Sequence, residues 1–372
     1  MGPASVSTAP TSAGDHPLFS QIVQLQVGGN LMSDERGVIL LNSVWGSKSI
    51  NSYTPDGQQL ATVPYPQSDG IEPVATGAAV LVSGTGFPQL AVETATLHPP
   101  AGVERATVDY SVTLYDGETL RPVWTSKLYT QTDTSDSPSD IRPDPLTVTT
   151  DSKWIVAQND TSHVVEVSSG SVRPVTGPAS AFGNYVALVP DAWHATVLDP
   201  VTLKPRYVAN PGIGKTDKRI DALQYIDRRH WFLDGDRALV QEGSSVFDVP
   251  AGRFSAGLTP APGGVADDNG IVVDSAANRL YVASFAGTLH AYELRTLRQL
   301  WTQKNVTAVY GSSPETVFVA TTTGQWAVLD AADGHQIQFA QQPEPAPTSQ
   351  TVSGKYCWRA TRDGTLIYQV LR

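Results

Sequence analysis

Apolar and polar residues alternate in short runs along most of this chain, and turn-forming residues separate the runs. The pattern is clearest in residues 280–301 and again in residues 317–337. Each segment reads as an apolar strand, a short glycine-bearing link, a second alternating strand, a polar turn and a third strand. Period-two alternation of this kind predicts antiparallel hairpins, and its recurrence predicts a repeated sheet. Helical periodicity is nearly absent, so we expect an all-β protein.

The turn after the most regular strand gives a register for the whole chain. Proline fixes φ in such turns, glycine takes positive φ, and Asp or Thr bonds to nearby backbone, as expected between antiparallel strands. Seven turns follow this chemistry: residues 54–57, 116–119, 167–170, 199–202, 249–252, 293–296 and 330–334.

An eighth unit begins at Tyr356 and runs to Val370, where it still needs an outer strand. The alternating segment from Phe19 to Val27 can supply that strand, which would close a ring and remove two exposed sheet edges. We therefore predict an eight-bladed β-propeller over residues 18–372, with about 44 residues per blade. Seven blades are the alternative if a weak unit, 151–175 or 225–258, is absorbed.

Composition argues against nucleic-acid binding and against membrane insertion. The chain has 372 residues and a formal net charge of -11, which argues against a nucleic-acid ligand because such domains usually carry a basic stripe. It has no run of 18 apolar residues, so we expect no direct membrane insertion. The single cysteine, Cys357, lies in an apolar run and is interpreted as a small buried strand residue.

The first 17 residues are rich in Ala, Ser, Thr, Pro and Gly and have no apolar core of a signal peptide. This composition predicts a disordered linker. In exported bacterial proteins such a linker joins a signal, lipid anchor or transmembrane helix to the folded domain. We therefore expect an extracytoplasmic protein: secreted, lipid-anchored or the ectodomain of a membrane protein.

The segment LYVASFAGTLHAYELRTLRQLW at residues 280–301 resembles the repeat of pyrroloquinoline-quinone-type propellers, the quinoprotein alcohol dehydrogenase-like superfamily. Gly287, Ala291 and Trp301 match its most regular positions, and residues 116–124 and 324–334 match it in part. The resemblance implies that the Trp of the outer strand docks against a neighbouring blade. Trp124 and Trp301 are then structural.

Quinone-dependent members of that superfamily use a vicinal cysteine pair, a calcium ion and a general-base Asp. A chain with one cysteine cannot supply the pair, so we expect the scaffold without the cofactor and without catalytic residues. The chain also contains no Gly-x-Ser-x-Gly, no His-Glu-x-x-His and no Gly-x-x-x-x-Gly-Lys-Ser/Thr motif.

Metal chemistry is the alternative. A propeller can gather distant histidines at its central funnel, so a metal-dependent lactonase, lyase or hydrolase remains open. The acidic loops at residues 133–144 and 267–268 lack the Asp-x-Asp-x-Asp-Gly calcium pattern and are interpreted as solvated, so we predict no metal site. The histidines, one per unit or fewer, are His16, His98, His163, His194, His230, His290 and His335.

The links within the hairpins depart from the repeat, and there we expect the binding face. Trp45, Trp193 and Phe285 are large aromatics in polar links, and aromatic residues are enriched at binding hot spots. Each could instead cover the end of its own blade. His194 follows Trp193 directly.

The longest insertion, residues 84–109, predicts a hairpin that projects beyond the second blade. Its alternating flanks are residues 90–97 and 103–114, and its tip contains Pro99 and Pro100. Long connections at residues 129–145, 209–221 and 259–269 are expected on the same face.

Together these features predict a non-catalytic binding, scaffold or sensor propeller. We expect it to recognise a protein, peptide or glycan, as part of an envelope or signalling complex. It would resemble the propellers of outer-membrane assembly lipoproteins and bacterial receptor kinases. The predicted contact residues are Trp45, Trp193, His194, Phe285, Pro99 and Pro100.

Overall fold

The structure is a computed structural model. The residues that it describes are 19–25, 30–34, 36–42, 49–64, 79–84, 86–98, 105–132, 145–159, 161–191, 194–209, 231–240, 245–255, 257–259, 262, 265, 270–341, 349–353, 356–360 and 365–370.

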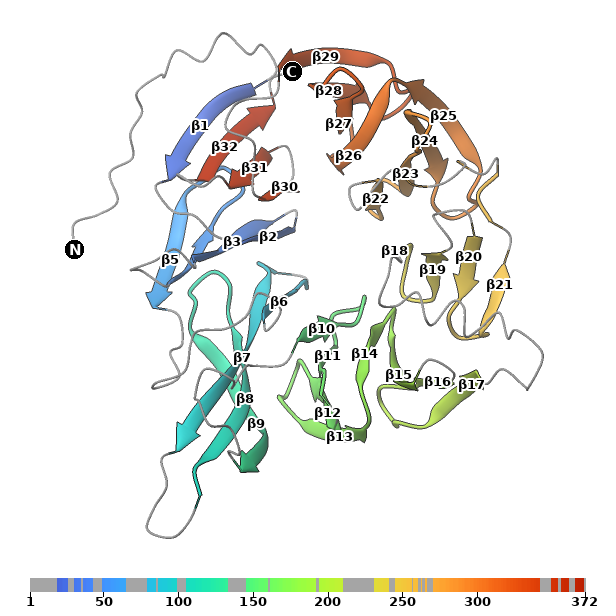
Figure 1. Cartoon of the computed structure of the whole chain (residues 1–372). Helices are drawn as coiled ribbons and strands as arrows, with labels where there is room; N and C mark the ends of the chain where they lie inside the picture. The colour runs from blue at the N-terminus through green and yellow to red at the C-terminus, as the bar shows by residue number, and fades with distance from the viewer. Residues whose placement is uncertain are drawn as a thin grey trace. The chain divides into compact units, whose positions relative to one another are not determined.

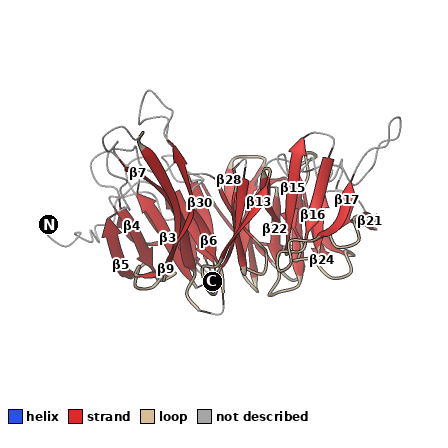
Figure 2. Ribbon diagram, turned by 90° about the horizontal axis from the view of Figure 1, so that it is seen from below, coloured by secondary structure: helices blue, strands red, loops and turns tan. Residues whose placement is uncertain are grey.

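Within these residues the regular structure is entirely β-strand, and the ribbon in Figure 2 shows strands and loops alone. The all-β prediction is therefore confirmed. The described strands form eight four-stranded sheets, labelled along the chain in Figure 1, and the strand pairs whose register is described are antiparallel. None of the described residues belongs to a helix long and apolar enough to cross a membrane.

Contacts between residues group the chain into two compact units. The first comprises Met1–Arg36, Thr54–Gln58 and Gln224–Arg372. Its strands are β1 (Phe19–Leu25), β2 (Asn30–Asp34), β18 (Trp231–Phe232), β19 (Arg237–Val240), β20 (Ser245–Asp248), β21 (Arg253–Ser255), β22 (Ile271–Asp274), β23 (Arg279–Ala283), β24 (Thr288–Glu293), β25 (Gln299–Lys304), β26 (Val306–Ser312), β27 (Thr316–Thr321), β28 (Gln325–Asp330), β29 (Gln336–Gln341), β30 (Ser349–Ser353), β31 (Tyr356–Ala360) and β32 (Thr365–Val370).

The second unit comprises Gly37–Tyr53 and Gln59–Leu223. Its strands are β3 (Gly37–Asn42), β4 (Ser49–Tyr53), β5 (Gln59–Pro64), β6 (Ala79–Val82), β7 (Gln89–His98), β8 (Thr107–Tyr115), β9 (Pro122–Thr132), β10 (Leu146–Val148), β11 (Trp154–Ala157), β12 (Thr161–Glu166), β13 (Val172–Thr176), β14 (Ala179–Phe182), β15 (Tyr185–Asp191), β16 (His194–Leu198) and β17 (Pro205–Ala209).

One sheet combines strands from distant parts of the sequence. Its order is β1-β32-β31-β30, whereas the other described sheets consist of four consecutive strands. β1 pairs antiparallel with β32, from Phe19 opposite Val370 to Leu25 opposite Thr365. This confirms the prediction that an amino-terminal strand completes the last sheet.

The seven predicted turns share a residue with positive φ. It is the fifth residue when the turns are counted from residues 53, 116, 166, 199, 248, 293 and 330. In the turn that starts at Asp116, the Leu120 N–H donates to the Asp116 carbonyl at 2.7 Å, and the Asp116 carboxylate accepts from the Thr119 N–H at 2.8 Å. Four turns place Gly at the fifth position and three place Leu: Gly57, Gly170, Gly252, Gly334, Leu120, Leu203 and Leu297.

Carbonyl groups in five of these turns accept hydrogen bonds from tryptophan or arginine side chains of neighbouring sheets. The Trp124 Nε1–H donates to the Val167 carbonyl at 2.8 Å, and the Trp301 Nε1–H donates to the Ala331 carbonyl at 3.1 Å. We call these contacts turn locks. They confirm the structural role expected of both tryptophans.

Other sheets make the same contact with different donors. The Trp358 Nε1–H donates to the Pro55 carbonyl at 3.1 Å. Arginine takes the place of tryptophan in two further turn locks: Arg173 donates to the Pro200 and Val201 carbonyls, and Arg237 to the Leu294 and Arg295 carbonyls.

Apolar side chains fill the space between neighbouring sheets. One cluster joins β23–β25 to β26–β28 through residues such as Tyr281, Val309 and Val319. Another joins β7–β9 to β10–β12 through residues such as Val112 and Ile155. Cys357 is 3% exposed, as expected for a buried strand residue.

Candidate functional site

Strands β7, β8 and β9 are the longest described strands, with 10, 9 and 11 residues, against at most 7 elsewhere. β6 pairs with β7 only from Gln89 to Val92, so the three strands continue past it. Figure 1 shows them as one long group. We call this three-stranded part the extension, and it consists of residues 93–98, 107–112 and 126–132.

The extension confirms one sequence expectation and corrects another. Two long antiparallel strands do occupy the insertion at residues 84–109, but β8 begins at Thr107 and not at residue 103. Residues 129–132 were assigned to a connection, and this was wrong, because β9 continues to Thr132. A bulge where β8 passes from Tyr110 to Ser111 shifts the register and breaks the alternation in β9.

Asp109 lies at the centre of one face of the extension. Its Oδ1 is 2.8 Å from the Lys127 Nζ and accepts the Thr130 hydroxyl at 2.7 Å, and its Oδ2 is 3.1 Å from the His98 Nε2. The hydrogen bonds from Lys127 and Thr130 lower the pKa of Asp109 to about 2. This face is polar, since cross-strand register also places Thr94, Thr96, Thr107, Ser111 and Thr132 on it.

The opposite face of the extension packs on the sheet β10–β13 through three stacked rings. The Tyr110 and Tyr129 ring centroids are 4.5 Å apart, and those of Tyr129 and His163 are 5.2 Å apart, with interplanar angles of 13° and 11°. The Asn159 side-chain N–H donates to the Tyr129 hydroxyl. We call this stack the seat of the extension. The sequence pattern does not reveal the seat, because its rings come from three different strands.

Phe285, a predicted contact residue, lies in the link between β23 and β24 and is 65% exposed. Gly287, with φ of 72°, closes this link, and Ser284 beneath it is buried. His194 begins β16 and pairs with Asp191. Trp45, Trp193, Pro99 and Pro100 lie outside the described residues, so the contact residues stay a prediction.

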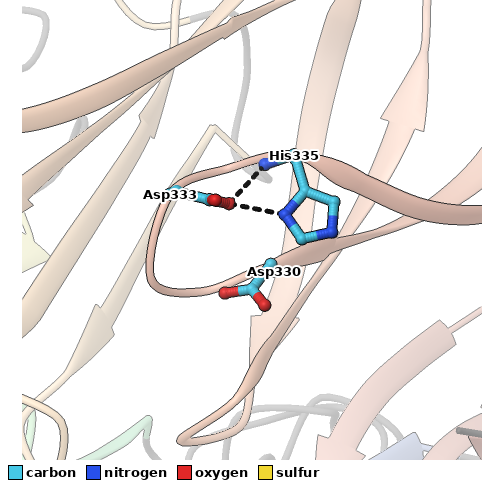
Figure 3. A group of neighbouring side chains, drawn as sticks. All are labelled: Asp330, Asp333 and His335. Atoms are coloured by element: carbon cyan, nitrogen blue, oxygen red, sulfur yellow. Dashed lines mark hydrogen bonds and ion pairs between the residues drawn. The ribbon is translucent and has the colours of Figure 1, made fainter.

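A group of potential metal ligands lies in the turn between β28 and β29 (Figure 3). One ligand atom each of Asp330, Asp333 and His335 lies within 4.8 Å of the others. The Asp333 Oδ1 accepts the His335 N–H at 2.9 Å and lies 2.7 Å from the His335 Nδ1. These hydrogen bonds lower the pKa of Asp333 and raise that of His335.

Hydrogen bonds within the turn explain why these three side chains lie close together. The Asp330 Oδ1 accepts the Ala332 N–H at 2.6 Å, as at the other acidic turns, and both Asp333 and His335 are exposed. All three residues come from one turn, whereas the metal alternative expected histidines gathered from several blades. The signal in the sequence was Asp-x-x-Asp-x-His at residues 330–335.

Repeated four-stranded sheets, joined by locks between neighbours, define a β-propeller. No family model matches the chain, and no curated protein matches it in sequence.

Solved structures do match it. BamB from Moraxella catarrhalis has 14% identity and a TM-score of 0.49, over 95% of this chain and 98% of its own. The computationally designed Ika8 protein has 13% identity and a TM-score of 0.50, over 94% and 98%. The C-terminal WD40 domain of Sif2 has 11% identity and a TM-score of 0.47, over 95% and 99%. At these identities the likeness concerns the fold alone.

Proposed function

We propose that this chain is a non-catalytic binding scaffold, an eight-bladed propeller over residues 18–372 that recognises a protein, peptide or glycan. The observation that carries this proposal is the extension. All three of its strands are longer than those of the repeat, and the added length forms an additional surface. The turn lock of the same sheet, made by Trp124, is retained.

The extension is ordered on both faces before any partner arrives. Asp109 ties together β7, β8 and β9 on the polar face, and the ring stack seats the other face. A surface that is already ordered loses less conformational entropy on binding, which favours affinity. Exposed hydroxyls at Thr96 and Thr130 give it hydrogen-bonding capacity.

Phe285 is the second predicted contact. Phe285 is 65% exposed, and covering its apolar surface with a partner would favour binding. We further propose an extracytoplasmic location within an envelope or signalling complex, which is supported by the composition of residues 1–17. Fractionation of cells that express the full-length protein tests the location.

Site-specific photo-crosslinking tests the binding role. A photoreactive amino acid replaces Thr96, Thr130 or Phe285, one at a time, in cells that express the full-length protein. We expect a discrete crosslinked partner at Thr96 and Thr130, and at Phe285 if it shares the contact. Glu118 is the matched control, since it is also exposed but lies in a turn. Adducts that are absent from the extension, or equally strong at Glu118, contradict the proposal.

A further inference from the structure

The seat of the extension ends on a buried histidine. His163 lies on β12, is 5% exposed and stacks on Tyr129. Its Nδ1 is buried and has no hydrogen-bond partner among the described residues. A neutral imidazole tolerates this environment, but an imidazolium has two N–H donors and a charge to satisfy.

The strands around His163 present few charges to it. Tyr110 and Tyr129 are the titratable groups that β8 and β9 contribute to the stack. β11 is apolar, and β13 places Pro174 opposite His163. Arg173 on β13 is directed to the Trp154 ring, with its guanidinium carbon 4.6 Å from the ring centroid, and to the turn at residues 200–201.

The remaining charges belong to the extension itself. Lys127 and His98 each bind Asp109 on the polar face of the extension, away from the stack. Glu93 of β7 is fully buried and, by register, lies on the same face as Tyr110, one cross-strand row away from it. The test must therefore separate the effect of Glu93 from that of His163.

We propose that His163 is an acid-sensitive latch: the extension is seated while His163 is neutral and is released when His163 takes a proton. Such a latch is a local order-to-disorder switch, in which the ring stack is formed in one state and broken in the other. The idea that the latch regulates partner binding rests on the proposed function. The release itself is a property of the chain alone.

The direction follows from linkage. Burial lowers the pKa of His163, whereas release returns the imidazole to water and to its ordinary pKa of about 6.5. The released state therefore binds more protons below that value, and acid favours release. At about pH 7.5 and above, one unit or more over that pKa, both states are neutral and pH has almost no effect. The contribution of His163 to seating is thus present at neutral pH and decreases as the pH falls through 6.5.

Amide hydrogen exchange on the full chain tests the latch. After correction for intrinsic rates, we expect protection in residues 93–98 and 107–112 to be about 3- to 30-fold lower at pH 5.0 than at pH 7.5. The upper limit of this change applies if His163 takes up a proton only in the released state, where its ordinary pKa is about 6.5. Strand β28 (Gln325–Asp330) serves as internal reference and should not change.

Two variants assign the effect. His163→Phe keeps an aromatic ring in the stack and should remove the pH dependence, while Glu93→Gln should retain it. The proposal is overturned if the wild-type extension shows equal protection at both pH values, or if the acid-induced loss persists in His163→Phe. Loss of the pH dependence in Glu93→Gln alone would assign it to Glu93 and also overturn the proposal.

Failure of the latch and failure of the binding role give different results. If exchange responds to pH as expected but no crosslink forms at Thr96 at pH 7.5, the binding role fails and the latch stands. If the crosslink forms equally at pH 5.0 and 7.5 and exchange does not change, the latch fails and the binding role stands.

Discussion

Two pairs of neighbouring sheets are joined by the same turn lock, but they differ at the links, which lie at the other end of the strands. In the pair β22–β25 and β26–β29, Trp301 binds the Ala331 carbonyl, and in the pair β6–β9 and β10–β13, Trp124 binds the Val167 carbonyl. A glycine with positive φ lies against each ring, Gly334 in the first pair and Gly170 in the second.

At the links the two pairs diverge. Strand β24 of the first pair has 6 residues, whereas β7, β8 and β9 of the second continue into the extension and its seat. The turn end therefore fixes how neighbouring sheets attach, and the link end is free to lengthen. A binding surface can be added at the links without any change to the locks.

The largest expected effect comes from adding one methyl group to a lock. A Cβ at Gly334 would lie 2.4 Å from the Trp301 Cε3, and φ there is 76°. Gly334→Ala should lower the free energy of unfolding by about 2–4 kcal/mol, as overpacking adds to backbone strain. Urea unfolding followed by circular dichroism measures it.

Gly324→Ala is the matched control, because φ is 74° but no atom lies within 4 Å of the new Cβ. It should lose only the strain, about 1–2 kcal/mol. Equal losses in the two variants would mean that the contact with Trp301 contributes nothing.

Removing the lock donor should affect both pairs alike. Trp301→Phe and Trp124→Phe each lose the hydrogen bond to a turn carbonyl and part of the ring contact. We expect each to lower the free energy of unfolding by about 1–3 kcal/mol. If Trp124→Phe has no measurable effect while Trp301→Phe does, the seat of the extension and not the lock holds the second pair together.

Asp109 belongs to the extension alone and should have a smaller effect. Asp109→Asn should cost about 1 kcal/mol or less, because Lys127 and His98 are half-exposed and solvent screens the ion pairs. The wild-type advantage should be present above about pH 3.8 and disappear as the pH falls through about 2, since the folded pKa is lowered. An advantage that increases on acidification would contradict the hydrogen-bonded geometry.

The smallest effect is expected at Leu203, where a half-buried Leu takes the place of Gly in a turn. Leu203 has φ of 55° and is half-buried, so Leu203→Gly relieves strain but loses packing. The net change should be under about 1 kcal/mol. Leu120→Gly, at 1% exposure, should lose about 2 kcal/mol or more by thermal or urea unfolding. Equal outcomes would show that burial does not separate the two turns.

The sequence predicted what repeats. Turn positions follow from local chemistry that recurs at a fixed interval, and the pairing of β1 with β32 follows from a last unit that lacks its outer strand. The roles of Trp124 and Trp301 follow from the resemblance of the repeat to a known family. The length of β9 could not be predicted, because the bulge at Leu128 interrupts the period-two alternation of the strand. The seat could not be predicted, since Tyr110, Tyr129 and His163 meet only through strand register and sheet packing.

The sheet that joins β1 to β32 also has a consequence for folding order. Strands β2 to β31 can pair with neighbours made just before or after them, by short-range hairpin closure. β1 has no such neighbour in its own sheet and pairs only after β32 has been synthesised. Until then, the apolar positions of β1 remain available to chaperones and to unwanted pairing with other strand edges.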